Sequence, residues 1–310
     1  MTPKVSICIP AYNEAELLRR ALDSIFVQKF LDFEVIVTDD SLDSTVEHLM
    51  GEYFDNSQLR YFKNVTPLGP PENWNSAIRL AQGDYIKLLH HDDWFATPES
   101  LGEFVEMLDK HPSVGFAFSG VAVQDVDRGL SRHHFATQRQ LFLLRAEPAC
   151  LFYGNFIGPP SATIVRRSAY VEYDKKLVWT VDISQYIEIL KNTEFATTRN
   201  ILICNSTGRP KQMTSLCIGD ARLNLYEYFY LYEKIESNII DSVRKKCISY
   251  LVEIIYKYGV YSEYEVRQAG FDGNLPKEVL SALGESNVAR EWYLVKRRLL
   301  SKIKARLNLR

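Results

Sequence analysis

Three polar clusters in the first hundred residues combine carboxylates with amide, hydroxyl or imidazole groups. They occupy residues 10–14 (PAYNE), 39–44 (DDSLDS) and 90–93 (HHDD). Carboxylates in such clusters can hold a divalent cation or accept hydrogen bonds from a base or a sugar, because Mg²⁺ and Mn²⁺ take oxygen ligands from carboxylates and phosphates. Each cluster also has a structural interpretation, with Asn13 and Ser44 as helix N-caps or the paired aspartates as a solvated turn.

Each cluster follows a stretch whose composition predicts a buried β-strand. These strands are predicted over residues 5–9, 33–38 and 85–89, and residues between them repeat apolar side chains at helical spacing. Such strand–helix–strand repetition predicts an α/β fold with a mostly parallel sheet flanked by helices. Ligands of open α/β sheets bind at the carboxyl ends of the strands, so we expect the three clusters to meet at one edge of the sheet.

The pattern in the rest of the sequence predicts further strands, followed by a region that contains only helices. Strands are expected over 113–123 and 161–167, and a polar, weakly periodic loop over about 125–148. Beyond residue 216 the strand patterns end, and segments rich in Leu, Tyr, Ile and Lys predict several helices. We therefore expect two regions, 1–215 and 216–310, the second being a helical C-terminal extension.

The absence of two nucleotide-binding motifs limits the kinds of ligand site that the sequence could form. No GxxxxGK[ST] is present, which excludes a P-loop, and no GxGxxG follows a strand, which disfavours a dinucleotide fold. A diphosphate bound without a glycine-rich loop needs another source of positive charge, and Asp92 and Asp93 are suited to hold a divalent cation. Asp39 or Asp40 could accept a hydrogen bond from the N–H of a uracil-like base, on which Tyr12 could stack.

The composition is that of an ordinary globular protein. Hydrophobic residues make up 46% of the chain, charged residues 25%, and the formal net charge is −2, so no nucleic-acid partner is expected. Five scattered cysteines without a CxxC pair disfavour a disulfide framework and favour a reducing, cytoplasmic location. No apolar run is long enough to span a bilayer.

The C-terminal segment 290–310 is strongly basic, with eight Lys and Arg residues against a single Glu. Its apolar residues recur on one helical face and its basic residues lie mostly off that face; the apolar ones are Trp292, Val295, Leu299, Ile303 and Leu307. A basic amphipathic helix with an aromatic anchor is typical of binding to an anionic membrane surface, here the inner face of the cytoplasmic membrane. The alternative is a helix packed on the acidic body with its basic side in solvent.

The three clusters, in this order, resemble the inverting glycosyltransferases of family 2, which have the GT-A fold. The resemblance rests on VSICIPAYNE, VIVTDDSLDST and the Gly83–Ile86 stretch with HHDD, and extends over residues 3 to 215. It implies transfer of a sugar from a nucleotide-diphosphate sugar, usually a UDP-sugar, to an acceptor hydroxyl with inversion at the anomeric carbon. It also implies a divalent metal, Mn²⁺ or Mg²⁺, a glycan or lipid-linked glycan acceptor, and a setting in bacterial surface polysaccharide synthesis.

By position, the resemblance implies a set of residues that contact the nucleotide sugar: Pro10, Ala11, Tyr12, Glu14, Asp39, Asp40, His90 and Asp93. Asp92 matches the carboxylate that holds the metal in the family's Asp-x-Asp motif, whereas His90 replaces the first carboxylate of that motif. An imidazole ligand suits Mn²⁺ better than Mg²⁺. A second departure is Trp74-Asn75, which stands where family members often have Arg-Asn.

The family's general base lies near the start of a helix, and Asp182 matches that position, about ninety residues beyond Asp92. Its alternative role is a helix N-cap, and Val181 replaces the acidic residue that usually precedes the base. The turn-rich segment before the next strand would border the acceptor, or be only a loop; its residues of interest are Asn155, Gly158, Pro160 and Ser161. Arg209 and Lys211 occupy the place where relatives position a residue that closes over the diphosphate.

Two other functions remain open from the sequence. His90 and Val181 depart from the family pattern, which would suit a catalytically weak nucleotide-sugar-binding partner of a larger synthase. A nucleotidyltransferase that makes the activated sugar is disfavoured, because such enzymes usually carry a Gly-rich, basic loop after the first strand and none is present at 10–16.

Overall fold

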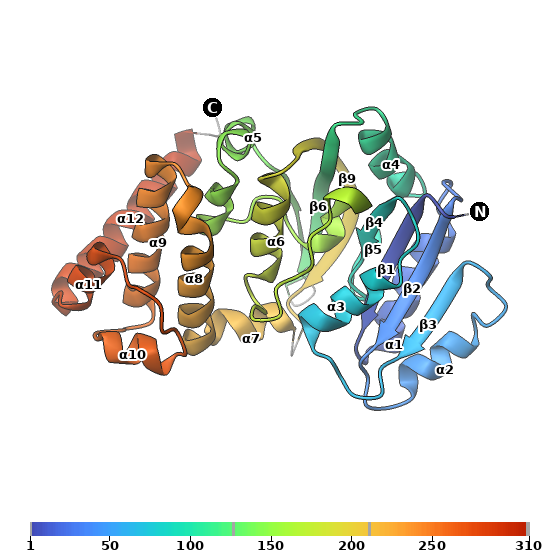
Figure 1. The fold of residues 1–310 in the computed structure, drawn as a ribbon, viewed down its shortest axis with the longest axis horizontal. Helices are drawn as coiled ribbons and strands as arrows, with labels where there is room; N and C mark the ends of the chain where they lie inside the picture. Colours follow the sequence, from blue (N-terminus) through green and yellow to red (C-terminus); the bar gives the residue numbers. More distant parts are fainter. Residues whose placement is uncertain (1, 126–127, 210–211, 308–310) are drawn as a thin grey trace. The chain divides into compact units, whose positions relative to one another are not determined.

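The computed structural model describes residues 2–125, 128–209 and 212–307. The chain divides into two compact units (Figure 1). The first comprises Met1–Leu151 and Asn155–Gln212, and the second comprises Phe152–Gly154 and Met213–Arg310. The sequence pattern places a division nearby, at 215/216.

The first unit is built on a sheet that has nine strands within the described residues, in the order β3-β2-β1-β4-β8-β6-β9-β5 with β7 paired to β6. The strands are β1 (Val5–Ala11), β2 (Phe33–Asp39), β3 (Leu59–Lys63), β4 (Tyr85–Leu88), β5 (Trp94–Phe95), β6 (Val114–Asp125), β7 (Leu130–His134), β8 (Thr163–Arg166) and β9 (Glu194–Thr207). β1 is parallel to β2 and β4, and β2 is parallel to β3. β8 runs antiparallel to both β4 and β6, so the sheet is mixed beyond β4. The predicted α/β class is confirmed: parallel pairing joins β3, β2, β1 and β4 in one part of the sheet, and β6 and β9 in another.

Helices cover both faces of this sheet, as predicted. They are α1 (Ala15–Phe26), α2 (Thr45–Gly51), α3 (Pro70–Arg79), α4 (Ser100–Asp109), α5 (Gln138–Ala146) and α6 (Val181–Leu190). Because side chains alternate across a strand, Val5, Ile7 and Ile9 of β1 share one core with residues of α1, α2 and α4. α3 contacts β1 and β2, and its buried Ala77 and Ile78 do not belong to that core.

The predicted loop over 125–148 is wrong for the part of this segment that the structure describes. Leu130–His134 forms β7, and Gln138–Ala146 forms α5. Thr137 and Gln140 build a capping box at the start of α5, with the Gln140 amide N–H donating to the Thr137 hydroxyl. Most residues of β7 are exposed, so the strand lacks the apolar alternation by which strands are recognised in sequence.

The second unit is helical, which confirms the predicted C-terminal extension. Its helices are α7 (Met213–Gly219), α8 (Ala221–Ile235), α9 (Asp241–Lys257), α10 (Glu263–Gln268), α11 (Lys277–Leu283) and α12 (Asn287–Leu307). Arg290 anchors α12, because its buried guanidinium donates to the carbonyl oxygens of Val260, Ala282 and Leu283 at 2.6–3.0 Å. Among the described residues, no helix combines the length and apolarity needed to cross a bilayer.

Candidate active site at the strand ends

The loop after β1 is a strained turn that presents Tyr12 and Glu14. Asn13 and Glu14 both adopt left-handed backbone conformations, with φ of 53° and 50°, which are uncommon for residues with a side chain. The Asn13 amide donates to the Ser41 hydroxyl at 2.7 Å, so the turn is tied to the loop that follows β2. Tyr12 is 51% exposed at this edge, where its ring is available to a ligand. Glu14, rather than Asn13, occupies the N-cap position of α1.

The remaining members of the first cluster contribute backbone rather than side chains. Pro10 and Ala11 are the last residues of β1, and both are buried. The Pro10 carbonyl lies 3.2 Å from Nδ1 of His91, and since a carbonyl only accepts, that nitrogen carries the proton. The Ala11 carbonyl accepts from the Asp40 amide at 3.0 Å. Backbone bonds therefore join the first cluster to both of the others.

Asp39 at the end of β2 is fully buried and already bonded within the protein. Its two carboxylate oxygens accept from the Ser41 amide and the Tyr61 hydroxyl, each at 2.8 Å, and Lys63 Nζ lies 3.5 Å away. The sequence interpretation as a solvated turn is therefore wrong for Asp39. Contact of this carboxylate with a base remains a prediction that would use its remaining acceptor capacity.

Asp40 is 4% exposed and orders the loop that leads into α3. Its carboxylate accepts from the Asn64 side chain at 2.7 Å and from the amides of Leu68 and Gly69 at 3.1 and 2.9 Å. Gly69, with φ of 83°, is the N-cap residue of α3. Asp40 therefore positions α3 relative to the end of β2. Its contact with a nucleotide stays a prediction from the sequence. Ser44 precedes α2 but makes no side-chain cap bond.

A geometry suited to a cation lies after β4. One ligand atom from each of His90, Asp92 and Asp93 falls within 4.8 Å of the others. Within the described part of the chain, His90 Nε2 and Asp93 Oδ2 are buried polar atoms without a hydrogen-bond partner. Unsatisfied buried atoms of this kind are costly unless a ligand or ion completes them. The donor set of one imidazole nitrogen and carboxylate oxygens therefore fits a divalent cation such as Mn²⁺.

Burial shapes the protonation of this group. It lowers the pKa of His90 to about 4, which leaves a neutral imidazole able to ligate a metal. Burial, together with the neighbouring Asp92 carboxylate, raises the pKa of Asp93 to about 7. Burial likewise lowers the pKa of Lys87, which lies on β4 three residues before His90, to about 7. Asn205 on β9 donates to Asp93 Oδ1 at 2.8 Å and holds that carboxylate in place.

Arg209 connects the first cluster to the metal-binding group. Its Nη1 donates to Glu14 Oε2 at 2.8 Å, and its Nη2 donates to Asp92 Oδ2 at 2.9 Å. The guanidinium thus offsets the charge of Asp92. Arg20 adds a second cation nearby, since its Nη2 donates to the Asp92 carbonyl at 2.9 Å while its guanidinium stacks 3.6 Å from the Trp94 ring. Lys211 lies outside the described residues.

The segment 155–161 links the metal-binding group to Asp182. At one end, the Ser161 hydroxyl accepts from the His90 amide at 3.0 Å, and its carbonyl accepts from the buried ammonium of Lys87. At the other end, Asn155 Nδ2 donates to Asp182 Oδ2 at 2.8 Å. Between them, Gly158 has a φ of 106°, a conformation that favours glycine. Pro160, buried, opens the short 3₁₀ turn Pro160–Ala162 that carries Ser161.

Asp182 lies in the first turn of α6 and is not the N-cap residue, which is Thr180. The alternative role of a plain N-cap is therefore wrong. Its Oδ1 accepts from the Ile183 amide at 2.8 Å and its Oδ2 from Asn155. Tyr186, one turn further, donates to the Gly158 carbonyl at 3.2 Å and fixes the same loop against α6. A half-buried carboxylate oriented in this way can accept a proton from a bound hydroxyl.

Sequence reasoning missed three residues of this site. Lys87 could have been noticed, because a lysine within the apolar strand YIKLL has to be buried or at an edge. Asn205 and Arg20 carry no local signal, since both reach the metal-binding group from elements distant in the sequence.

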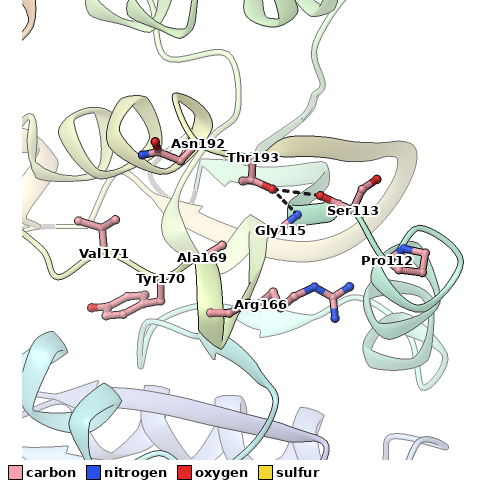
Figure 2. Close-up of a pocket in the computed structure, with 10 residues that line it drawn as sticks. Pro112, Ser113, Gly115, Arg166, Ala169, Tyr170, Val171, Asn192 and Thr193 are labelled. Carbon is pink, nitrogen blue, oxygen red and sulfur yellow. Dashed lines mark hydrogen bonds between the residues drawn. The ribbon is translucent and has the colours of Figure 1, made fainter.

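A separate pocket of about 360 Å³ lies at the opposite ends of the strands (Figure 2). Arg166, which lines it, pairs with Tyr85 at the start of β4, and Gly115 lies at the start of β6. The Thr193 hydroxyl in this pocket accepts from the Gly115 amide at 2.8 Å and donates to the Ser113 carbonyl at 3.3 Å. None of the predicted site residues lines the pocket, so it is distinct from the candidate active site.

Comparison with known proteins agrees with this geometry. Residues 6–174, more than half of the chain, match the family model described as glycosyl transferase family 2. The chain belongs to this family. It is 33% identical over 192 residues to the abequosyltransferase RfbV of Salmonella typhimurium, an alignment covering 57% of each protein. It is 37% identical over 93 residues to the GalNAc(5)-diNAcBac-PP-undecaprenol beta-1,3-glucosyltransferase of Campylobacter jejuni, covering 29% of this chain and 30% of that protein.

The alignments span between 30% and 66% of the length of the curated relatives. Two solved structures resemble this chain in fold over most of its length. S. aureus TarS 1–349 in complex with UDP-GlcNAc has a TM-score of 0.62 and 18% identity, covering 91% of this chain and 80% of that one. The mannosyltransferase PcManGT of Pyrobaculum calidifontis, in complex with GDP-Man and Mn²⁺, has a TM-score of 0.58 and 18% identity, covering 99% and 88%. These likenesses confirm the GT-A fold.

Proposed function

We propose that this protein is an inverting glycosyltransferase that moves a sugar from a nucleotide-diphosphate sugar, a UDP-sugar by preference, to an acceptor hydroxyl. The observation that carries the proposal is the continuous connection from His90 through Ser161 and Asn155 to Asp182. It ties a carboxylate suited to be a general base to a group suited to hold a cation.

Tyr12 and Glu14, with the carboxylates of Asp39 and Asp40 behind them, would frame the base and ribose of the donor. The solved structures of similar fold contain UDP-GlcNAc in one protein and GDP-Man with Mn²⁺ in another, which supports a nucleotide sugar as the ligand class. The exposed ring of Tyr12 offers a stacking surface that is compatible with any base, so the preference for uracil rests on the family resemblance.

Asp92 would hold a divalent cation, Mn²⁺ or Mg²⁺, with His90 and Asp93 beside it. A bound cation offsets the negative charge of a diphosphate leaving group. Arg209 would have to leave Asp92 Oδ2 when a cation binds there, and its guanidinium would then be free to pair with a phosphate oxygen.

Asp182 would take the proton of the acceptor hydroxyl while that oxygen attacks the anomeric carbon. The new bond joins the acceptor oxygen to the anomeric carbon, and the bond from that carbon to the phosphate oxygen breaks, so the nucleoside diphosphate leaves with the electron pair. The Asn155 side chain, which donates to Asp182 Oδ2 and to the Gly158 carbonyl, would keep the carboxylate aimed at the acceptor loop.

Release of nucleoside diphosphate from a panel of nucleotide sugars tests the proposal. With Mn²⁺ present, wild type should turn over at least one donor, and Asp182→Asn should lower kcat by about 10²–10⁴ while leaving donor Kd nearly unchanged. Equal hydrolysis by wild type and Asp182→Asn would remove Asp182 from the role of base. Donor binding without any turnover would instead favour the catalytically weak binding partner.

We also propose that α12 binds an anionic membrane surface, where a lipid-linked acceptor would be found. An apolar stripe on α12 is exposed: Val288 by 78%, Trp292 by 68%, Val295 by 62% and Leu299 by 59%. The opposite side of α12 packs on α9, with the Tyr293 hydroxyl donating to the Ser249 carbonyl at 3.3 Å. The described stripe is thus not the side that packs on α9. The side chains of Ile303 and Leu307 lie outside the described part of the chain.

Co-sedimentation with vesicles tests this surface. Deleting 290–310 would also remove Arg290 and its buried hydrogen bonds, so point substitutions are the better test. The double variant Trp292→Ser, Val295→Ser should lose most of the binding to phosphatidylserine-containing vesicles, because it removes the apolar anchor. Tyr264→Ser, which changes a 69% exposed aromatic on α10, is the matched control. Undiminished binding by the double variant would rule out α12 as the membrane contact.

A further inference from the structure

Arg20 is a cation of the candidate site that has no carboxylate of its own. Its Nη2 donates to the Asp92 carbonyl at 2.9 Å, and its guanidinium stacks 3.6 Å from the centroid of the Trp94 ring. No carboxylate of the described residues lies within ion-pair distance of Arg20, whereas Arg19, its neighbour on α1, makes two bonds of 2.6 Å to Glu52. A half-buried cation normally has a partner of opposite charge, so Arg20 retains its charge for an anionic ligand.

One nitrogen of the Arg20 guanidinium is available to such a ligand. Its Nη1 makes no hydrogen bond within the described part of the chain and is not among the buried atoms that lack a partner, so it is open to solvent. Its Nε, like that of Arg209, is one of those buried atoms. Burial and the positive charge of Arg209 lower the pKa of Arg20. Because burial has removed part of its hydration, this guanidinium gains more from an added anion than a fully solvated arginine would.

Arg20 and Arg209 differ in what holds them beside Asp92. Arg209 is bonded to the carboxylates of Glu14 and Asp92, and a cation that binds Asp92 takes over one of these oxygens. Arg20 is held by a backbone carbonyl and by the Trp94 ring, neither of which is a cation ligand in the group of His90, Asp92 and Asp93. Binding of a cation therefore displaces one guanidinium and leaves the other in place against the same residue.

We propose that Arg20 binds the diphosphate of the nucleotide-sugar donor, with its Nη1 donating to a phosphate oxygen beside the cation. This inference rests on the proposed function and adds a donor-binding residue to the same site. Negative charge builds on the diphosphate when the bond from the anomeric carbon to the phosphate oxygen breaks. A guanidinium that is already fixed stabilises this charge without having to reorganise during the reaction.

Calorimetric binding of nucleoside diphosphates to the full chain at saturating Mn²⁺ tests Arg20 without relying on turnover. UDP, GDP, dTDP and CDP are compared on wild type, and the one bound most tightly is used on the variants. Arg20→Met should raise its Kd by about tenfold or more, because a charge-assisted hydrogen bond is lost. Arg20→Lys should fall between the two, since it keeps the charge but not the planar stack on the ring. Arg19→Met is the matched control and should change the Kd by less than about twofold, because Arg19 pairs with Glu52 outside the site.

A second measurement separates contact with the diphosphate from an indirect effect through Asp92. Electron paramagnetic resonance of free Mn²⁺ gives the Kd of the cation for each ligand-free variant. If Arg20 contacts the diphosphate itself, Arg20→Met should bind Mn²⁺ no more weakly than wild type while it loses nucleoside diphosphate affinity. Equal weakening of both ligands would show that Arg20 only positions Asp92, and this result would overturn the proposal.

Unchanged nucleoside diphosphate affinity in Arg20→Met would overturn the proposal as well. Both results leave the proposed transferase function intact, because wild type still binds the nucleotide. If Arg20→Met lacks a cooperative urea transition, Arg20→Lys replaces it in both measurements, with the same criteria. If wild type bound no nucleoside diphosphate in the presence of Mn²⁺, the proposed function itself would fall, and the role of Arg20 with it.

Discussion

Replacing Arg209 with methionine should strengthen the binding of a divalent cation to the ligand-free protein. Arg209 Nη2 donates to Asp92 Oδ2 at 2.9 Å, and Asp92 is the residue that we expect to hold the cation. A cation entering the group formed by His90, Asp92 and Asp93 has to compete with the guanidinium for that oxygen. Methionine keeps much of the side-chain volume and removes both the charge and the donors.

The size of the effect follows from the geometry of the Arg209–Asp92 pair. A hydrogen bond to a charged group contributes about 1.5–3 kcal/mol. The side chains of Arg209 and Asp92 are 19% and 23% exposed, so water weakens the pair and the lower end of that range applies. A contribution of about 1.5 kcal/mol corresponds to about a tenfold change in Kd. Loss of the positive charge near the cation acts in the same direction.

Electron paramagnetic resonance of free Mn²⁺, titrated with ligand-free protein near neutral pH, measures this Kd directly. Arg209→Met should lower the Kd by about tenfold, and Asp92→Asn should raise it. Arg19→Met is the matched control, because it breaks an arginine–carboxylate pair of 2.6 Å with Glu52 outside the site. An unchanged or higher Kd in Arg209→Met would refute competition between the guanidinium and the cation.

Three further substitutions have defined outcomes. Lys87 has a pKa lowered to about 7 by burial, so the unfolded chain binds its proton more readily between pH 7 and 10 and wild-type stability should rise with pH there. The free energy of unfolding of wild type minus that of Lys87→Met should therefore increase by up to about 1.4 kcal/mol per pH unit in urea titrations, and a difference independent of pH would contradict the lowered pKa of Lys87. Gly83→Ala should destabilise the fold by about 1–3 kcal/mol in the same assay, because an added Cβ would lie 2.7 Å from the Ser6 amide nitrogen. Gly51→Ala is the control, because its added Cβ meets no atom within 4 Å, and equal unfolding midpoints for the two variants would refute the clash. Asn155→Ala should lower kcat by about 10–100-fold with little change in donor KM, measured by nucleotide release, and an unaltered kcat would remove Asn155 from positioning Asp182.

Local patterns in the sequence determined the class of the fold and the edge of the sheet that carries the polar clusters. β1, β2 and β4 each show the short apolar run of a buried parallel strand, and each is followed directly by a polar cluster. The expected parallel pairing of these three strands brings their carboxyl ends together, which places the clusters that contain Tyr12, Asp40 and His90 at one edge of the sheet. The resemblance to the family motifs then predicted a role for individual residues within these clusters.

Only the tertiary structure decided which of those side chains are available to a ligand. Asp39 and Asp40 look alike in the sequence, yet each is buried and bonded to different neighbours, Tyr61 for one and the loop before α3 for the other. Asp92 meets Arg209, 117 residues away, and Asp93 meets Asn205, 112 residues away. No local pattern encodes such pairings, because periodicity reports which face of an element is buried, whereas the partner of a buried polar group depends on how distant elements pack.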